Sequence, residues 1–83
     1  MKIEMKLYAT LMRYLPDGAN DHTALLDVAD GTTPSQVIDD MKLPRESCFL
    51  VLVNGIFLSP EERETRAMHE GDALAIWPPI AGG

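Results

Sequence analysis

The sequence is poor in cysteine and histidine, which excludes several kinds of site at once. Its one cysteine, Cys48, cannot form an intramolecular disulfide and fits a reducing compartment. His22 and His69 are isolated and lack the spacing of a zinc site. No apolar run approaches the roughly 20 residues of a membrane span, and the first residues lack the apolar core of a signal peptide. We therefore expect a cytoplasmic protein with no metal and no membrane segment.

Basic residues are also few. Seven Lys and Arg stand against 13 Asp and Glu, a formal charge of −6 that repels nucleic acid and suits docking on basic protein partners. The 83 residues leave room for one globular domain. No Gly-rich phosphate-binding loop is present, so we expect no bound cofactor, and any ATP chemistry must be performed by another protein.

Alternation and turn signals predict an α+β domain in the order β-β-α-β-β-β. Thr33-Pro34-Ser35-Gln36 is typical of a helix start, with Thr33 as the N-cap and Gln36 returning the capping bond, and Leu43-Pro44 ends this helix. Asn54-Gly55 predicts a type I′ turn, in which both residues need positive φ. Strands are expected over residues 2–9, 24–28, 48–53, 56–58 and 73–77.

Two stretches are interpreted further. The run 48–53 has no polar alternation, which predicts a central strand with little solvent on either face. The stretch 59–66 is interpreted as a charged crossover, and 11–15 as a short helical turn.

Few side chains suggest catalysis. Cys48 is a candidate nucleophile, but a cysteine inside an apolar run is more often a buried small hydrophobe, and we interpret it as structural. The acidic pairs at 39–40 and 61–62 suggest acid–base chemistry only weakly, because adjacent residues point in different directions. We expect them to be solvated surface or docking contacts.

The C-terminal stretch Pro78-Pro79-Ile80-Ala81-Gly82-Gly83 has the features of a projecting tail. Two consecutive prolines cannot donate hydrogen bonds to a sheet and favour extended backbone, so the strand that precedes them should end near Trp77. The side chains then shrink to two glycines, which need the least room in a narrow channel. Six extended residues reach on the order of 20 Å, enough to enter the active site of a second protein.

These residues belong to a longer pattern. Val51-Leu52-Val53-Asn54-Gly55, followed by the run from Met68-His69-Glu70-Gly71-Asp72 to the Pro-Pro-Ile-Ala-Gly-Gly end, resembles the MoaD/ThiS family of sulfur carriers. Trp77 stands where that family usually has Phe, and Ala73 where it usually has an acidic residue.

The resemblance implies a single ubiquitin-like β-grasp domain over residues 1–77 and a protruding diglycine tail over 78–83. It also implies that the carboxylate of Gly83, beside Gly82, is adenylated and converted to a thiocarboxylate. Partner contacts are expected at Trp77, Pro78, Pro79, Ile80 and Ala81, although Trp77 could equally fill the core.

The implied partners are an E1-like adenylating enzyme of the MoeB/ThiF kind that uses ATP, a persulfide sulfur donor, and a MoaE-like large subunit of molybdopterin synthase. The paired prolines favour the small subunit of that synthase, a sulfur-donating chain with no catalytic site of its own. A ThiS-like carrier for thiamine or another sulfur-containing product is the alternative. A protein modifier conjugated through Gly83 and an interaction module with an inert tail are the other hypotheses.

Overall fold

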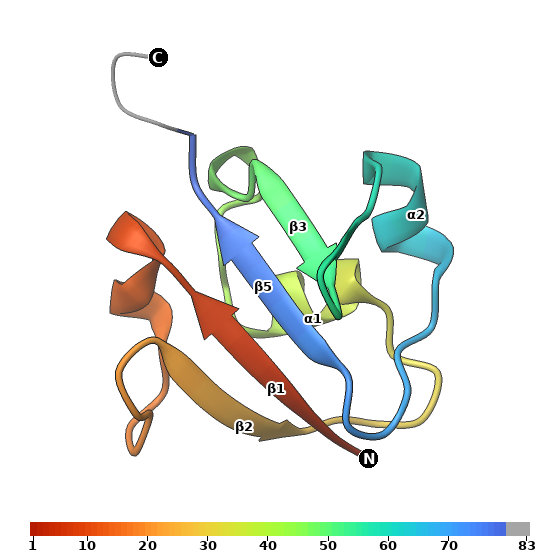
Figure 1. Ribbon diagram of the computed structural model, residues 1–83, viewed down its shortest axis with the longest axis horizontal. Helices are drawn as coiled ribbons and strands as arrows, with labels where there is room; N and C mark the ends of the chain where they lie inside the picture. Colours follow the sequence, from red (N-terminus) through yellow and green to blue (C-terminus); the bar gives the residue numbers. More distant parts are fainter. Residues whose placement is uncertain (80–83) are drawn as a thin grey trace.

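The last strand of the chain lies in the middle of the sheet. A computed structural model describes residues 1–79, in which five strands form one mixed sheet in the order β2-β1-β5-β3-β4. The strands β1 and β5 run side by side in the same direction, while the other neighbours are antiparallel (Figure 1). Their bounds are β1 (Lys2–Leu7), β2 (Thr23–Asp27), β3 (Leu50–Val53), β4 (Ile56–Phe57) and β5 (Ala73–Trp77).

The helix α1 (Pro34–Asp40) begins with the predicted capping box. Gln36 N–H donates to Thr33 Oγ1 over 3.3 Å, and the N–H of Thr33 donates to Gln36 Oε1 over 2.9 Å. These two bonds satisfy two of the amide groups that a helix start leaves without partners. In Figure 1, α1 lies behind β5 and β3, so it covers one face of the sheet.

The charged crossover expected over 59–66 contains a further helix, α2 (Pro60–Thr65), which the predicted element order omits. Ser59 and Glu62 form a second capping box at its start. The helix buries none of its residues fully, so it has no apolar stripe from which periodicity could predict it. Two 3₁₀ segments, η1 (Ala9–Tyr14) and η2 (Arg45–Ser47), complete the secondary structure, and η1 covers most of the predicted turn at 11–15. Neither α1 nor α2, nor any other helix within residues 1–79, is long and apolar enough to cross a membrane.

A cluster of buried apolar side chains lies between the sheet and α1. Cys48 belongs to this cluster, its thiol donates to the carbonyl of Pro44 over 3.4 Å, and burial raises the pKa of the thiol. The prediction that Cys48 is a buried structural side chain is therefore confirmed. The sheet and helix residues of the cluster are Ile3, Met5, Leu7, Val37, Ile38, Val51, Val53, Leu74 and Ile76.

Five predicted strand bounds differ from those in the structure, and two of these are the ends of β2, which lies one residue earlier than the predicted 24–28. β1 ends at Leu7 because Ala9, with φ of 53°, already begins η1. β3 begins only at Leu50, and β4 ends at Phe57. The prediction of a central strand is confirmed, because β3 is paired with β5 on one side and with β4 on the other. The prediction that little solvent reaches either face is wrong, because β3 has one covered and one open face and Phe49 before it is 66% exposed.

The turn at Asn54 and Gly55 has the predicted positive φ angles, 52° and 82°. Its side chains also join a second turn: Asn54 Nδ2 donates to Asp72 Oδ1 over 2.9 Å, and Asn54 Oδ1 accepts from the N–H of Ala73 over 2.9 Å. The other oxygen of Asp72 accepts from the N–H of His69 over 2.8 Å. Burial alone would raise the pKa of Asp72, but these hydrogen bonds outweigh it and hold the pKa below its ordinary value.

Gly55→Val tests the turn. The new side chain meets open space, so the cost comes from the positive φ, and we expect a loss of about 1 to 3 kcal/mol in the free energy of unfolding. Thermal unfolding measures it, with Gly55→Asn as the control, because asparagine tolerates this conformation better. Equal thermal midpoints for wild type and Gly55→Val would contradict the turn assignment.

Asp72→Asn tests the link between the turns, because one of its two oxygens becomes a donor. At pH 7 we expect a loss of about 1 to 3 kcal/mol. Since the folded-state pKa is lowered, the carboxylate stabilises the fold above its unfolded pKa of about 3.9 and loses this effect as the pH falls through the folded pKa. Urea unfolding at pH 7 and pH 3 should therefore show a difference between wild type and variant that shrinks in acid. A difference that is constant with pH would contradict the role of the carboxylate.

Candidate functional site

The candidate site is the root of the C-terminal tail, which we define as Trp77–Pro79. The carbonyl of Trp77 accepts a hydrogen bond from the N–H of Phe49 over 3.0 Å, at the β3 side. One residue earlier, the carbonyl of Ile76 accepts from the N–H of Tyr8 over 3.3 Å, at the β1 side. Pro78 and Pro79 carry no N–H and cannot extend the ladder. The sheet therefore holds the chain from both sides up to Trp77, where β5 ends as predicted.

A stack of aromatic rings supports the tail root. The rings of Tyr8 and Trp77 lie parallel, with centroids 4.2 Å apart and an interplanar angle of 1°. The imidazole of His22 also packs against the ring of Tyr8, with centroids 4.7 Å apart and an interplanar angle of 32°. Aromatic pairs of this kind add about 0.5 to 1.5 kcal/mol to the stabilisation that comes from burial of their area. Trp77 is half-buried by this stack and lies outside the core cluster, so it does not fill the core.

The tail root continues into an apolar sheet surface, which we call the open face. Side chains of paired residues on neighbouring strands point to the same face. Leu50 is paired with Trp77, and Leu52 is paired with both Ala75 and Phe57. Phe57 is 51% exposed and Leu50 is 36% exposed. Because helix α1 covers the opposite face, the open face presents apolar side chains to solvent beside the tail root.

Charged side chains border the open face on β1. Glu4 and Lys6 on this strand carry opposite charges. The Oε1 atom of Glu4 and the Nζ atom of Lys6 are 3.4 Å apart. Glu4 is paired with Ala73 and Lys6 with Ala75, so both point to the open face. This surface therefore joins an apolar area over β3–β5 to a polar margin over β1, the combination typical of a protein interface.

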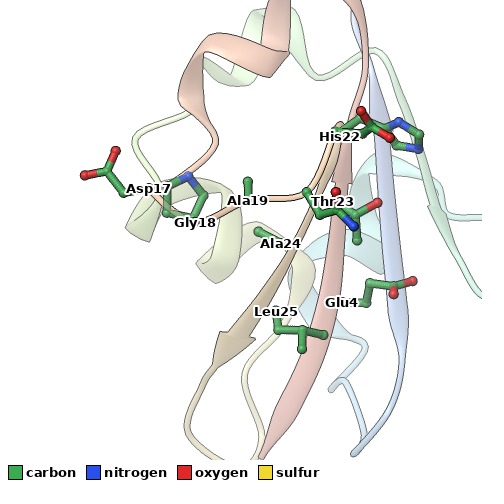
Figure 2. A pocket seen from close by; sticks show the side chains of 11 residues that line it. Glu4, Asp17, Gly18, Ala19, His22, Thr23, Ala24 and Leu25 are labelled. Atoms are coloured by element: carbon green, nitrogen blue, oxygen red, sulfur yellow. The ribbon is translucent and has the colours of Figure 1, made fainter.

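A hollow lies beside the far end of the aromatic stack, at His22. It measures about 590 Å³ and is lined by the loop before β2 together with Glu4 and Leu25. Figure 2 shows these two strand side chains below the hollow and the Asp17–Ala19 stretch across it. Among residues 1–79, no group of three His, Cys, Asp or Glu side chains is placed to hold a metal ion. We place the candidate site at the tail root, because β5 leads from there to the diglycine of the sequence.

The predicted site residues divide into two groups. Trp77 and Pro78 are half-buried, and Pro79 is exposed. Ile80, Ala81, Gly82 and Gly83 lie outside the described residues, so the predictions made for them, and the division between domain and tail, stay predictions.

Tyr8 and Phe57 are part of the site but were not predicted to be. For Tyr8 a signal exists, because the alternation that buries Leu7 places Tyr8 on the other face. Phe57 follows the predicted turn, but turn chemistry alone does not say which surface it joins.

The mixed sheet, the helix across one face and the central last strand define a ubiquitin-like β-grasp protein. A model of the ThiS family matches residues 5–83, and the chain belongs to this family. A comparison with curated proteins finds no significant match.

Two solved structures are similar. The crystal structure of SAMP1 from Haloferax volcanii has 27% identity and a TM-score of 0.69, with all of both chains covered. The solution structure of the Haloferax volcanii HVO 2177 protein has 24% identity and a TM-score of 0.76, covering 100% of this chain and 87% of that one. This second likeness shows the fold alone. The predictions of the fold and of a MoaD/ThiS-like family are confirmed.

Trp77→Ala tests the contribution of the ring at the tail root. Because the ring lies outside the core, we expect the circular dichroism spectrum to be retained and the free energy of unfolding to fall by about 1 to 2 kcal/mol. Trp77→Phe is the matched control, since a phenyl ring can still stack on Tyr8. Collapse of the fold in Trp77→Ala would show that the ring is a core residue after all.

Proposed function

We propose that this protein is a sulfur carrier whose Gly83 carboxylate is adenylated and then converted to a thiocarboxylate. The observation that carries the proposal is the ThiS family match, which runs to residue 83 and includes the diglycine. The geometry of the tail root supports it, because the strand that leads to this end is held between β1 and β3.

The chemistry of a carboxylate explains why activation comes first. A free carboxylate is a poor electrophile because it is anionic and would have to expel oxide. When its oxygen attacks the α-phosphorus of ATP, pyrophosphate leaves and a mixed anhydride with AMP forms. A persulfide sulfur can then attack the carbonyl carbon and displace AMP, and a thiol that cleaves the sulfur–sulfur bond leaves the thiocarboxylate. In this scheme the carrier is the substrate, and the ATP is bound by the adenylating partner.

The open face and the charge support docking on such partners. Family membership and the likeness to SAMP1 point to interaction with E1-like activating enzymes. We propose that the adenylating enzyme, of the MoeB/ThiF kind, and the acceptor enzyme each bind the open face in turn, with contacts to Trp77, Pro78 and Pro79. The formal charge of −6 favours partners with basic margins. Docking then sets a high effective concentration of the Gly83 carboxylate or thiocarboxylate at the partner's active site.

We further propose that the sulfur is transferred to a pterin precursor, which becomes molybdopterin, with a MoaE-like large subunit as the acceptor enzyme. The paired prolines Pro78 and Pro79 favour this over a thiamine carrier. A ThiS-like role in making thiamine or another sulfur-containing metabolite is the alternative.

A protein modifier is the second candidate, and the likeness to SAMP1 fits it. In that case a lysine amine of a target protein attacks the activated carbonyl of Gly83 and forms an isopeptide bond.

Intact-mass analysis distinguishes these functions. The protein is incubated with ATP, an E1-like adenylating enzyme from the same organism and a persulfide donor. Replacement of one oxygen by sulfur at Gly83 supports a carrier, and conjugates of higher mass on other proteins support a modifier. If neither product forms although the enzyme activates its other carriers, the proposal fails.

A one-residue extension tests the working group itself. Adding alanine after Gly83 moves the carboxylate by about 3.5 Å and puts a methyl group where only glycine should fit. We expect an unchanged thermal midpoint and near-normal partner binding, together with loss of thiocarboxylate formation by mass spectrometry. Deletion of Gly83 should have the same effect. Sulfur transfer at the wild-type rate in either variant would exclude the diglycine as the working group.

A further inference from the structure

Arg63 of α2 binds three backbone carbonyls instead of an acid. Its Nε donates to Leu58 over 3.2 Å, its Nη1 to Cys48 over 3.1 Å, and its Nη2 to Phe49 over 3.2 Å. Among residues 1–79 no carboxylate lies within ion-pair distance of this guanidinium. The rigid fork of a guanidinium suits a fixed set of acceptors in a way that the ammonium of lysine does not.

One of these carbonyls belongs to the peptide group that holds the tail root. The carbonyl of Cys48 and the N–H of Phe49 are two ends of one planar peptide. Arg63 donates to the carbonyl end over 3.1 Å, and the N–H end donates to the carbonyl of Trp77 over 3.0 Å. A cation therefore connects through one peptide group to the last carbonyl of β5.

This arrangement strengthens and orients the hydrogen bond to Trp77. A charged donor at the carbonyl polarises the peptide, which makes its N–H a better donor. The contact to the carbonyl of Phe49 fixes the next peptide as well, so the segment before β3 cannot rotate away. On the other side of β5, the ring of Tyr8 supports the ring of Trp77. The tail root is thus restrained by its carbonyl on the β3 side and by its ring on the β1 side.

A second arginine, Arg45, makes a different set of hydrogen bonds. Arg45 of η2 binds the carboxylates of Asp39 and Glu64, each over 2.8 Å, and none of its bonds reaches β5 or the tail root. Both arginines join one element to another, but only Arg63 is connected to Trp77.

We propose that Arg63 is a positioning residue for the C-terminal carboxylate. By fixing the Cys48–Phe49 peptide, it holds the carbonyl of Trp77 and sets the direction in which Pro78 and Pro79 leave the sheet. This inference rests on the proposed function, because direction matters only when the carboxylate must reach a reaction centre in a partner. A misplacement of about 1 Å at such a centre lowers a rate by up to roughly a hundredfold.

Arg63→Lys tests the proposal with Arg45→Lys as the matched control. Both changes keep the charge and remove the guanidinium fork. The first measurement is amide hydrogen exchange of Phe49 by NMR, and the second is ATP–pyrophosphate exchange with the E1-like adenylating enzyme from the same organism. Adenylation is measured well below the thermal midpoint, and exchange of the Phe49 amide is compared with exchange of the other sheet amides, because a loss of global stability accelerates them together.

For Arg63→Lys we expect exchange of the Phe49 amide to accelerate by roughly an order of magnitude. The Arg63 guanidinium also lies 5.8 Å from the ring centroid of Phe57 on the open face, where a lysine ammonium keeps a cation near the ring. We therefore expect kcat for adenylation to fall by about tenfold with a smaller change in KM. Arg45→Lys should match wild type in both measurements. Arg63→Gln, which keeps an amide donor but not the fork, provides a second variant should Arg63→Lys fail to fold.

Three results would overturn the inference. Unchanged exchange at Phe49 would show that the peptide is held without Arg63. Faster exchange with a wild-type kcat would show that Arg63 has a structural role only. A rise in KM with unchanged kcat would make Arg63 a docking contact. If wild type itself supports no pyrophosphate exchange with an enzyme active on another carrier, the proposed function fails, and this inference fails with it.

Discussion

The parallel pairing of β1 with β5 is the constraint on which the rest of the structure depends. It joins the two ends of the chain, with Met5 opposite Leu74 and Leu7 opposite Ile76, and all four side chains are fully buried. Parallel neighbours cannot be joined by a tight turn, so the chain between them must return to the end of the sheet at which β1 began. As a consequence the C-terminal strand is central and bonded on both sides. A tail attached to an edge strand would start from the part of a sheet that opens most easily.

Much of the fold could be predicted because its signals are local. The capping box at Thr33 and Gln36 and the positive φ of Asn54 and Gly55 depend only on neighbouring residues, and both predictions are confirmed. The run 48–53 was misjudged for a physical reason. Apolar residues on both sides of a strand indicate two apolar environments, but one of them here is a solvent-exposed face, and periodicity cannot distinguish a second core from an interface.

For the candidate site, the sequence predicted the tail but not the side chains that support its root. The Pro-Pro and Gly-Gly pattern and the family resemblance led to the tail, while nothing in the spacing connects Tyr8 or Arg63 with Trp77. Those contacts arise because two strands and a helix from distant parts of the sequence meet at one end of the sheet. The helix that carries Arg63 was itself missed, since it has a capping signal at Ser59 but no buried stripe. A guanidinium that binds carbonyls also leaves no pattern of paired charges to find.

A carrier and a modifier would place the same demand on this structure. In both, the electrophile is the carbonyl of an activated terminal glycine, and they differ in the nucleophile, a persulfide sulfur or a lysine amine. Neither nucleophile can correct a misdirected tail, because the reacting atoms must approach to about 3 to 3.5 Å. Glycine as a residue type loses the most backbone entropy when it is placed, so a diglycine that must enter a narrow channel benefits from a fixed starting point. The restraint of Trp77 from both sides of β5 supplies such a starting point, and it fits either chemistry.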